Sequence, residues 1–311
     1  MNRTLIIGSR GSKLALFQAE QAKARLFEAN HSIDVRIEII KTTGDVKSDP
    51  LTVIGGKGVF TKELEDALID RRIDIAVHSL KDLPTIVPPP LTIGAICERE
   101  DPRDALVLRL DSNSASATLD GLPAQAIVGT SSQRRFTQLK ALRPDVVIKD
   151  LRGNVDTRLR KLDEGQYDAL ILASAGLKRL GLADRISVAI SPQQMLPAVG
   201  QGAVAIEVRG DDEISQNAVR SLDHYSTRLA CLAERSFLRA LGGGCQLPIA
   251  AHAILEGDEL ALDGLVASQD GKKIVRNTIS GKATDAELLG TQLAERLISL
   301  GANSLLQNSR T

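Results

Sequence analysis

Aromatic residues are scarce in this sequence: Phe, Trp and Tyr make up 2% of its 311 residues, and there is no Trp. Proteins that bind single-stranded nucleic acid stack its bases on aromatic side chains, so this composition argues against such a platform. The sequence also lacks a net charge, because Lys plus Arg and Asp plus Glu number 39 each. General binders of nucleic acid or of membrane surfaces depend on a bulk positive charge. Any anion-binding site must therefore be local.

Cysteines are few, and long apolar runs are missing. Cys97, Cys231 and Cys245 are an odd number without C-x-x-C spacing, which favours reduced thiols over a disulfide framework or a zinc site. The N-terminal apolar run is too short for a signal peptide, and no stretch approaches the length of a membrane span. We therefore expect a cytoplasmic protein that binds no metal, no membrane and no nucleic acid.

Strand-like and helix-like segments alternate along most of the chain. Apolar runs such as TLIIGS and IDIAVHSL predict strands, and the helical spacing of residues 13–29 predicts a helix. This alternation predicts two α/β domains. The first comprises residues 1–101 with 200–220 and is expected to have a mainly parallel sheet, and the second comprises residues 102–199. Residues 221–311 combine helices at both ends with strands between them, which predicts a smaller α+β domain.

Basic residues follow several predicted strands, where open α/β sheets bind their ligands. In GTSSQRR, one of Thr130, Ser131 and Ser132 can cap a helix, and the two arginines can offer forked donors to carboxylates. An arginine in the first helical turn opposes the helix dipole, so a solvated surface position would be an unusual use of it. An ordinary charged surface is the alternative interpretation. The basic residues are Arg10, Lys81, Arg134, Arg135, Arg152 and Arg179.

Asp82, in HSLKDLP, is a carboxylate next to Lys81 at a predicted strand end. One interpretation is a surface ion pair that contributes little energy. The other is an anion kept ionised by nearby cations, which accepts a hydrogen bond from a substrate N–H and stabilises a developing positive charge. In the same strand His78 is expected to be a core histidine with its hydrogen bonds satisfied. Cys97 is expected to be a buried apolar residue.

Two glycine-rich stretches need an explanation. In LGGGCQLPIA three glycines precede Cys245, and the simplest interpretation is a helix C-cap followed by an incidental cysteine. One glycine is enough for a cap, so the others can leave space beside the thiol. The stretch VIGGKGVF fits neither the Walker A nor the dinucleotide-binding pattern, which favours a mobile loop that carries Lys57 over a nucleotide site.

Together these stretches resemble the porphobilinogen deaminase family. The motifs RGSKLAL, GGKGVFTKELE, DIAVHSLKDLP, GTSSQRR, LRGNVDTRL, LPAVGQGA and GGGCQLPI occur here in the family's order. The resemblance implies two domains like the halves of a type II periplasmic-binding protein, with the chain crossing twice between them, and a third domain that carries a cysteine. It also implies a covalent dipyrromethane cofactor and a monomeric enzyme of tetrapyrrole biosynthesis.

The implied reaction joins four porphobilinogen molecules head to tail and releases ammonia, and hydrolysis then frees linear hydroxymethylbilane. By motif match, Asp82 would be the catalytic residue, because it would bind pyrrole N–H groups and stabilise the azafulvene cation. Each pyrrole ring carries an acetate and a propionate, which would explain the arginines. The implied cofactor-binding residues are Cys245 (through a thioether), Lys81, Asp82, Thr130, Ser131, Ser132, Arg134, Arg135, Arg152 and Arg158. Those implied to bind porphobilinogen or the growing oligopyrrole are Arg10, Ser12, Lys57, Arg179, Gly200 and Gln201.

Some positions depart from the family, and other functions remain open. Val53 stands where the family often has a lysine before the glycine-rich loop, so Lys57 gains importance. A non-catalytic two-domain carboxylate-binding protein is the main alternative, although such a protein has no need of a third domain with a glycine-flanked thiol. A cysteine hydrolase is weaker, because no motif supplies a histidine base to Cys245.

Overall fold

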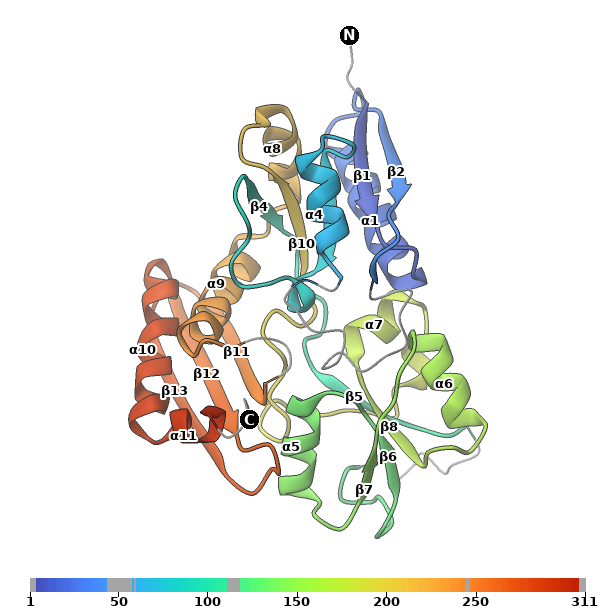
Figure 1. The fold of residues 1–311 in the computed structure, drawn as a ribbon, viewed down its shortest axis with the longest axis vertical. Coiled ribbons are helices and arrows are strands. Elements are labelled where there is room, and N and C mark those ends of the chain that lie inside the picture. Colours follow the sequence, from blue (N-terminus) through green and yellow to red (C-terminus); the bar gives the residue numbers. More distant parts are fainter. Residues whose placement is uncertain (1–3, 44–57, 59, 111–117, 244–246, 308–311) are drawn as a thin grey trace. The chain divides into compact units, whose positions relative to one another are not determined.

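The computed structural model describes residues 4–43, 58, 60–110, 118–243 and 247–307 (Figure 1). Contacts within the described part divide the chain into two compact units. The chain passes from unit 1 to unit 2 after Glu100, returns after Gly202, and enters unit 2 again after Leu229. Unit 1 comprises Met1–Glu100 and Ala203–Leu229, and unit 2 comprises Asp101–Gly202 and Ala230–Thr311.

Unit 1 is built on a mixed sheet. Among its described residues, five strands form the order β2-β1-β3-β10-β4. β1 is parallel to β2 and β3, whereas β10, the strand after the return crossing, is antiparallel to β3 and β4. The strands are β1 (Leu5–Ser9), β2 (Val35–Ile39), β3 (Ile75–Ser79), β4 (Leu91–Ile96) and β10 (Val204–Arg209), and the helices are α1 (Lys13–Ala29), α4 (Lys62–Ile69) and α8 (Glu213–Val219).

The sheet of unit 1 is covered on both faces. Val77 of β3 belongs to the apolar cluster that includes Leu26 of α1, whereas Ala76 belongs to the cluster that includes Leu64 of α4. Successive side chains of a strand point to opposite faces, so His78 lies on the α4 side. Burial on both faces explains why β3 reads as an almost continuous apolar run.

Unit 2 repeats this arrangement. Its described residues include a sheet of order β7-β6-β8-β5-β9, in which β6 is parallel to β7 and β8 and β5 is antiparallel to β8 and β9. β5, the strand after the outgoing crossing, occupies the place that β10 has in unit 1. The prediction of two type II periplasmic-binding-like domains with a double crossing is therefore confirmed. The elements are β5 (Asp104–Leu108), β6 (Ile127–Gly129), β7 (Val147–Lys149), β8 (Ala169–Ala173), β9 (Val188–Ala189), α5 (Gln133–Leu142), α6 (Val155–Asp163) and α7 (Ser174–Arg179).

The C-terminal part of unit 2 is the predicted α+β domain (Figure 1, orange and red). Its described strands pair antiparallel in the order β11-β12-β13, and α10 packs on β12 and β13. A Cβ at Gly290 of α10 would lie 2.3 Å from the Ala233 carbonyl oxygen of α9, so only glycine permits this close approach. The elements are α9 (Tyr225–Ala240), which begins in unit 1 and enters unit 2 after Leu229, β11 (Ile249–Glu256), β12 (Glu259–Ala267), β13 (Ile274–Lys282), α10 (Ala286–Ser299) and α11 (Ala302–Gln307).

The glycine run after α9 begins as a helix C-cap. Gly242 has a φ of +62° and its amide donates to the Arg239 carbonyl oxygen at 2.9 Å, while the Gly243 amide donates to that of Leu238 at 3.0 Å. Glycine adopts this left-handed conformation at little cost, so the predicted cap is confirmed. Cys245 lies outside the described residues, and so does the VIGGKGV stretch with Lys57, apart from Gly58.

Candidate functional site

Asp82 and Lys81 lie in one short 3₁₀ turn at the carboxyl end of β3. The turn, Leu80–Asp82, follows β3 without a gap. The Leu80 amide donates to the carbonyl oxygen of Ala203 at 3.0 Å, and Ala203 directly precedes β10. Lys81 and Asp82 are half-buried. The structure therefore places Asp82 at the end of a central strand, as predicted.

The carboxyl end of β1 carries Arg10 and Ser12. The Arg10 guanidinium lies over the ring of Phe60, 4.2 Å from its centroid, where the ring face attracts the cation. Ser12 is the N-cap of α1, and its hydroxyl accepts a hydrogen bond from the Ala15 amide at 3.3 Å. Because β1 and β3 are adjacent parallel strands, Arg10 and the Leu80–Asp82 turn follow the same edge of the sheet.

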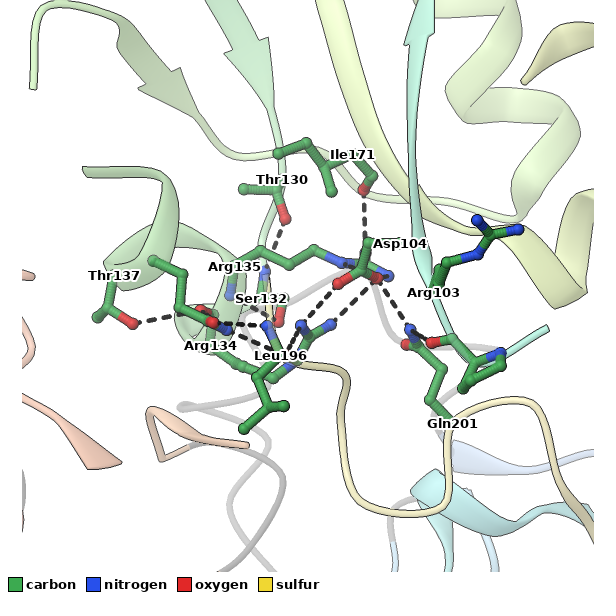
Figure 2. A network of polar contacts seen from close by, with 12 residues as sticks. Arg103, Asp104, Thr130, Ser132, Arg134, Arg135, Thr137, Ile171, Leu196 and Gln201 are labelled. Atoms are coloured by element: carbon green, nitrogen blue, oxygen red, sulfur yellow. Dashed lines mark hydrogen bonds and ion pairs between the residues drawn. The ribbon is translucent and has the colours of Figure 1, made fainter. Parts of the chain in front are cut away.

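Asp104 is the centre of a buried cluster in unit 2 (Figure 2). Arg134 Nη1 donates to its Oδ2 at 2.6 Å, and Arg135 Nε and Nη2 donate to its Oδ1 at 3.0 and 2.8 Å. The relative exposures of Asp104, Arg134 and Arg135 are 0%, 5% and 6%. Arg134 Nη1 also donates to the Leu196 carbonyl oxygen, and Arg135 Nη1 to that of Ile171. One carboxylate and two carbonyl groups thus hold the arginine pair.

The cluster carries more positive than negative charge. Burial raises the pKa of Asp104, but the charges of Arg134 and Arg135 and their hydrogen bonds outweigh burial and hold this pKa well below its ordinary value. Burial lowers the pKa of Arg135, yet arginine stays protonated in proteins. Two guanidinium groups therefore face one carboxylate. Arg134 Nε is buried without a hydrogen-bond partner among the described atoms, so one donor of the cluster is unused.

The same carboxylate fixes the return crossing of the chain. Gln201 Nε2 donates to Asp104 Oδ1 at 2.9 Å and to the Pro102 carbonyl oxygen at 2.7 Å, which ties the outgoing and returning segments together. Beside it, the Gly200 amide donates to Glu234 Oε2 of α9 at 2.7 Å, and Gly200 has a φ of +69°. Gly200 and Gln201, both predicted to bind substrate, therefore use these donors to shape the crossing segment.

Thr130, Ser131 and Ser132 shape the start of α5. The Thr130 hydroxyl accepts from the Ser132 amide at 3.2 Å, and the Ser132 hydroxyl caps α5 by accepting from the Arg135 amide at 3.5 Å. The Ser131 hydroxyl accepts from the Leu151 amide at 2.9 Å and donates to the Leu151 carbonyl oxygen at 3.0 Å. Ser132 is thus the cap, while Ser131 joins the end of β6 to the segment that follows β7.

The other predicted arginines of unit 2 lie on neighbouring segments. Arg152 follows β7, Arg158 lies in α6, and Arg179 is the last residue of α7; all three are half-buried. Arg158 Nε donates to the Gly153 carbonyl oxygen at 2.7 Å, and Arg179 Nη2 donates to that of Gly202 at 2.7 Å. The Arg179 bond reaches the last residue of unit 2 before the chain returns to unit 1.

Sequence reasoning found most of this cluster but missed its centre. The structure brings Arg134, Arg135 and Gln201 together on Asp104, which was not among the predicted site residues. Asp104 is the last residue of EDPRD, a charged stretch that reads as a surface crossing. The available signal was the apolar run ALVL directly after it, which is typical of a buried strand that begins at Asp104.

The described part of the chain offers neither a membrane span nor a metal-binding cluster. Its helices include none that is both long and apolar enough to span a membrane. Its His, Cys, Asp and Glu side chains do not gather in any group of three or more that could hold a metal ion. Cys97 and Cys231 are both buried, with relative exposures of 8% and 0%, so the expectation of a buried Cys97 is confirmed.

We predict that Asp104→Asn destabilises the protein by about 3–5 kcal/mol at pH 7, because it leaves two buried guanidinium groups without a counter-charge. The lowered pKa of Asp104 means that its contribution is complete above the ordinary carboxyl pKa and is lost as the pH falls toward the folded-state value. The stability difference between wild type and variant should therefore narrow below about pH 4.

Urea unfolding at several pH values measures this difference. Glu164→Gln is the control, because it removes the exposed ion pair with Arg160, in which the two side chains are 66% and 44% exposed. Its effect should stay below about 1 kcal/mol. An Asp104→Asn protein as stable as this control, or a difference that does not change with pH, would contradict the assignment of Asp104 as the counter-ion.

Comparison with known proteins matches two family models. Residues 5–217 match "Porphobilinogen deaminase, dipyromethane cofactor binding domain", and residues 228–299 match "Porphobilinogen deaminase, C-terminal domain". The chain is 52% identical over 307 residues to the porphobilinogen deaminase of Roseiflexus sp. (strain RS-1), covering 98% of this chain and 99% of that protein. It is 50% identical over 305 residues to the porphobilinogen deaminase of Nostoc sp. (strain PCC 7120), covering 98% and 94%.

Among solved structures, the chain aligns with the second substrate binding domain of a putative amino acid ABC transporter from Streptococcus pneumoniae, with a TM-score of 0.46, 14% identity and coverage of 77% of this chain and 95% of that one. A probable amino-acid ABC transporter extracellular-binding protein from Bacillus subtilis aligns with a TM-score of 0.42, 11% identity and coverage of 71% and 91%. Nothing about ligands follows at these scores. The sequence matches decide the assignment: the chain belongs to the porphobilinogen deaminase family.

Proposed function

We propose that the chain joins four porphobilinogen molecules head to tail on a covalently bound dipyrromethane primer, releases ammonia, and hydrolyses the product to hydroxymethylbilane. The observation that carries this proposal is the cluster of Asp104, Arg134 and Arg135 at the carboxyl edge of a sheet. Its surplus positive charge and its unused Arg134 donor suit a substrate whose every ring carries two carboxylates. Membership of the family supports the reaction class.

The described residues of unit 2 fit a group rich in carboxylates. Arginine binds carboxylates with two parallel hydrogen bonds, and arginines come from α5, α6, α7 and the segment after β7. When bound, the dipyrromethane supplies a pyrrole carbon as nucleophile. We propose that Cys245, outside the described residues, anchors it through a thioether. The side chains proposed to hold its carboxylates and pyrrole N–H groups are Lys81, Asp82, Thr130, Ser131, Ser132, Arg134, Arg135, Arg152 and Arg158.

Asp82 is the residue that we assign to the chemical step. A carboxylate on a short turn at a strand end can accept hydrogen bonds from pyrrole N–H groups and stabilise the positive charge that forms as ammonia leaves porphobilinogen. Arg10, at the same sheet edge, is proposed to bind a carboxylate of porphobilinogen, as are Arg179 and Lys57. Ser12 contributes through the α1 cap that it forms.

We predict that intact-protein mass spectrometry of the purified chain finds an increment equal to two linked pyrroles with their acetate and propionate groups. Cys245→Ser should remove the increment and turnover together, because no other thiol would anchor the primer. Cys97→Ala is the matched control and should keep the increment, since Cys97 is buried in the core of unit 1. A bare-chain mass in protein that turns over porphobilinogen would disprove the covalent primer.

We predict that Asp82→Ala lowers kcat by about 100-fold to 1,000-fold, the usual cost of removing one group that stabilises charge in the transition state. Asp82→Glu keeps a carboxylate at a shifted position, so its kcat should fall by a smaller factor. Asp70→Ala is the control: Asp70 is an exposed carboxylate at the end of α4 in the same unit. Circular dichroism should match wild type in all three variants. An Asp82→Ala enzyme with normal kcat would refute the assignment.

A further inference from the structure

His78 and Glu207 form a buried pair next to the Asp82 turn that the proposed reaction does not use. His78 Nε2 lies 3.0 Å from Glu207 Oε2, and the two residues are 5% and 0% exposed. His78 is directly opposite Ala205 in the β3–β10 ladder, so the contact crosses diagonally between the two strands on the α4 face. The prediction of a buried, hydrogen-bonded histidine is confirmed. Its partner is a fully buried carboxylate, which is costly to place in a core.

The next residue, Ser79, is held on the other face of the sheet. Gln18 of α1 is 3% exposed, and its Nε2 donates to the Ser79 hydroxyl at 3.0 Å. The following amide, that of Leu80, donates to the Ala203 carbonyl oxygen at 3.0 Å. Three consecutive residues are therefore fixed by directional polar contacts: His78 from one face of the sheet, Ser79 from the other face, and Leu80 from the segment that precedes the neighbouring strand β10. Asp82 follows only two residues later.

Stability alone gives a poor account of the His78–Glu207 contact. A buried pair of hydrogen-bonded polar side chains adds little stability, and apolar residues of similar volume often serve as well or better. The rest of β3 uses such packing, since Ile75 and Val77 lie in an apolar cluster. A hydrogen bond, unlike apolar packing, fixes direction as well as separation. Polar contacts concentrate at the end of β3. There the direction in which the chain leaves the strand decides where the Asp82 side chain lies.

A second carboxyl group, that of Glu65, borders this pair. Burial raises the pKa of Glu65 on α4, and the negative charge of Glu207 raises it further, while the charge of His78 lowers it. Asp66, on the same helix, acts in the same direction as Glu207. Oε1 of Glu65 and Oε1 of Glu207 are buried and have no hydrogen-bond partner within the described structure. Among the described side chains, His78 is the hydrogen-bonding partner of Glu207.

We propose that His78 and Glu207, together with Ser79 and Gln18 on the opposite face, are positioning residues that fix the direction in which the Asp82 turn leaves β3. This inference rests on the proposed role of Asp82. A misplacement of about 1 Å in a reacting group can cost about 100-fold in rate. We call these four residues the clamp. Loss of the clamp should therefore lower kcat while substrate affinity changes little.

The test replaces the pair by apolar residues, in a double variant carrying His78→Leu and Glu207→Leu. Apolar replacement of a buried pair is often neutral or stabilising, so the protein should remain folded. We expect kcat to fall by about 10-fold to 100-fold, with KM within about 3-fold of wild type. Glu207→Gln keeps an oxygen that accepts from His78, and it should retain kcat within about 3-fold of wild type.

Asp212→Asn is the matched control. It removes the negative charge from the buried ion pair of Asp212 with Arg209 at the opposite end of β10, so it should reduce stability and leave kcat unchanged. If the double variant fails to fold, Ser79→Ala removes the clamp on the α1 face with little change in volume. Ser79→Ala should lower kcat by about 3-fold to 10-fold. Normal kcat in the folded double variant, or in Ser79→Ala, overturns the inference.

A second background separates this inference from the assignment of Asp82. Positioning residues act through Asp82. The double variant should therefore lower kcat by a much smaller factor in an Asp82→Glu protein, whose carboxylate is already displaced. An equal loss in both backgrounds would mean that the pair acts independently of Asp82, and the inference would be wrong. Wild-type kcat in Asp82→Glu and Asp82→Ala would instead refute the role of Asp82 itself.

Discussion

Unit 2 depends on one electrostatic constraint: the buried carboxylate of Asp104 is the counter-ion of two buried guanidinium groups. Arg134 and Arg135 lie in the first turn of α5, where the helix dipole disfavours positive charge. Asp104 offsets this by binding both, and its remaining contact with Gln201 fixes the return crossing. The carboxylate of Asp104 is thus shared by three parts of unit 2. These are β5, the start of α5, and the segment before the return crossing. A substitution at Asp104 should therefore destabilise these other segments as well as β5.

The two units use buried polar groups for different purposes. In unit 2 the surplus of positive charge suits ligands that bring their own carboxylates, as porphobilinogen and its oligomers do. In unit 1 the cluster of His78, Glu207, Ser79 and Gln18 lies behind a half-buried carboxylate on a short turn. We interpret the cluster in unit 2 as one that binds the carboxylates of the substrate, and the cluster in unit 1 as one that positions the Asp82 carboxylate. Both include residues at the end of a strand, where an α/β sheet meets its ligand.

Local patterns in the sequence predicted much of the fold, and non-local pairing limited the rest. The helix of residues 13–29 was predicted to the residue, because its apolar spacing and its Ser12 cap lie within one segment. β5 was missed: it is only five residues long and forms its pairs with β8 and β9, far along the chain. Asp104 was missed with it, because a charge that begins a strand looks like surface until its distant partners are known. The role of Cys245 came from family resemblance alone.

The central claim is that the chain performs chemistry on porphobilinogen rather than only binding its carboxylates. Ammonia release measures this most directly. Purified protein is incubated with porphobilinogen, and free ammonia is determined together with the linear tetrapyrrole that is formed. We expect four ammonia molecules for each hydroxymethylbilane, with release continuing over many turnovers. Saturable binding of porphobilinogen without release of ammonia would contradict the claim and would favour a carboxylate-binding protein instead.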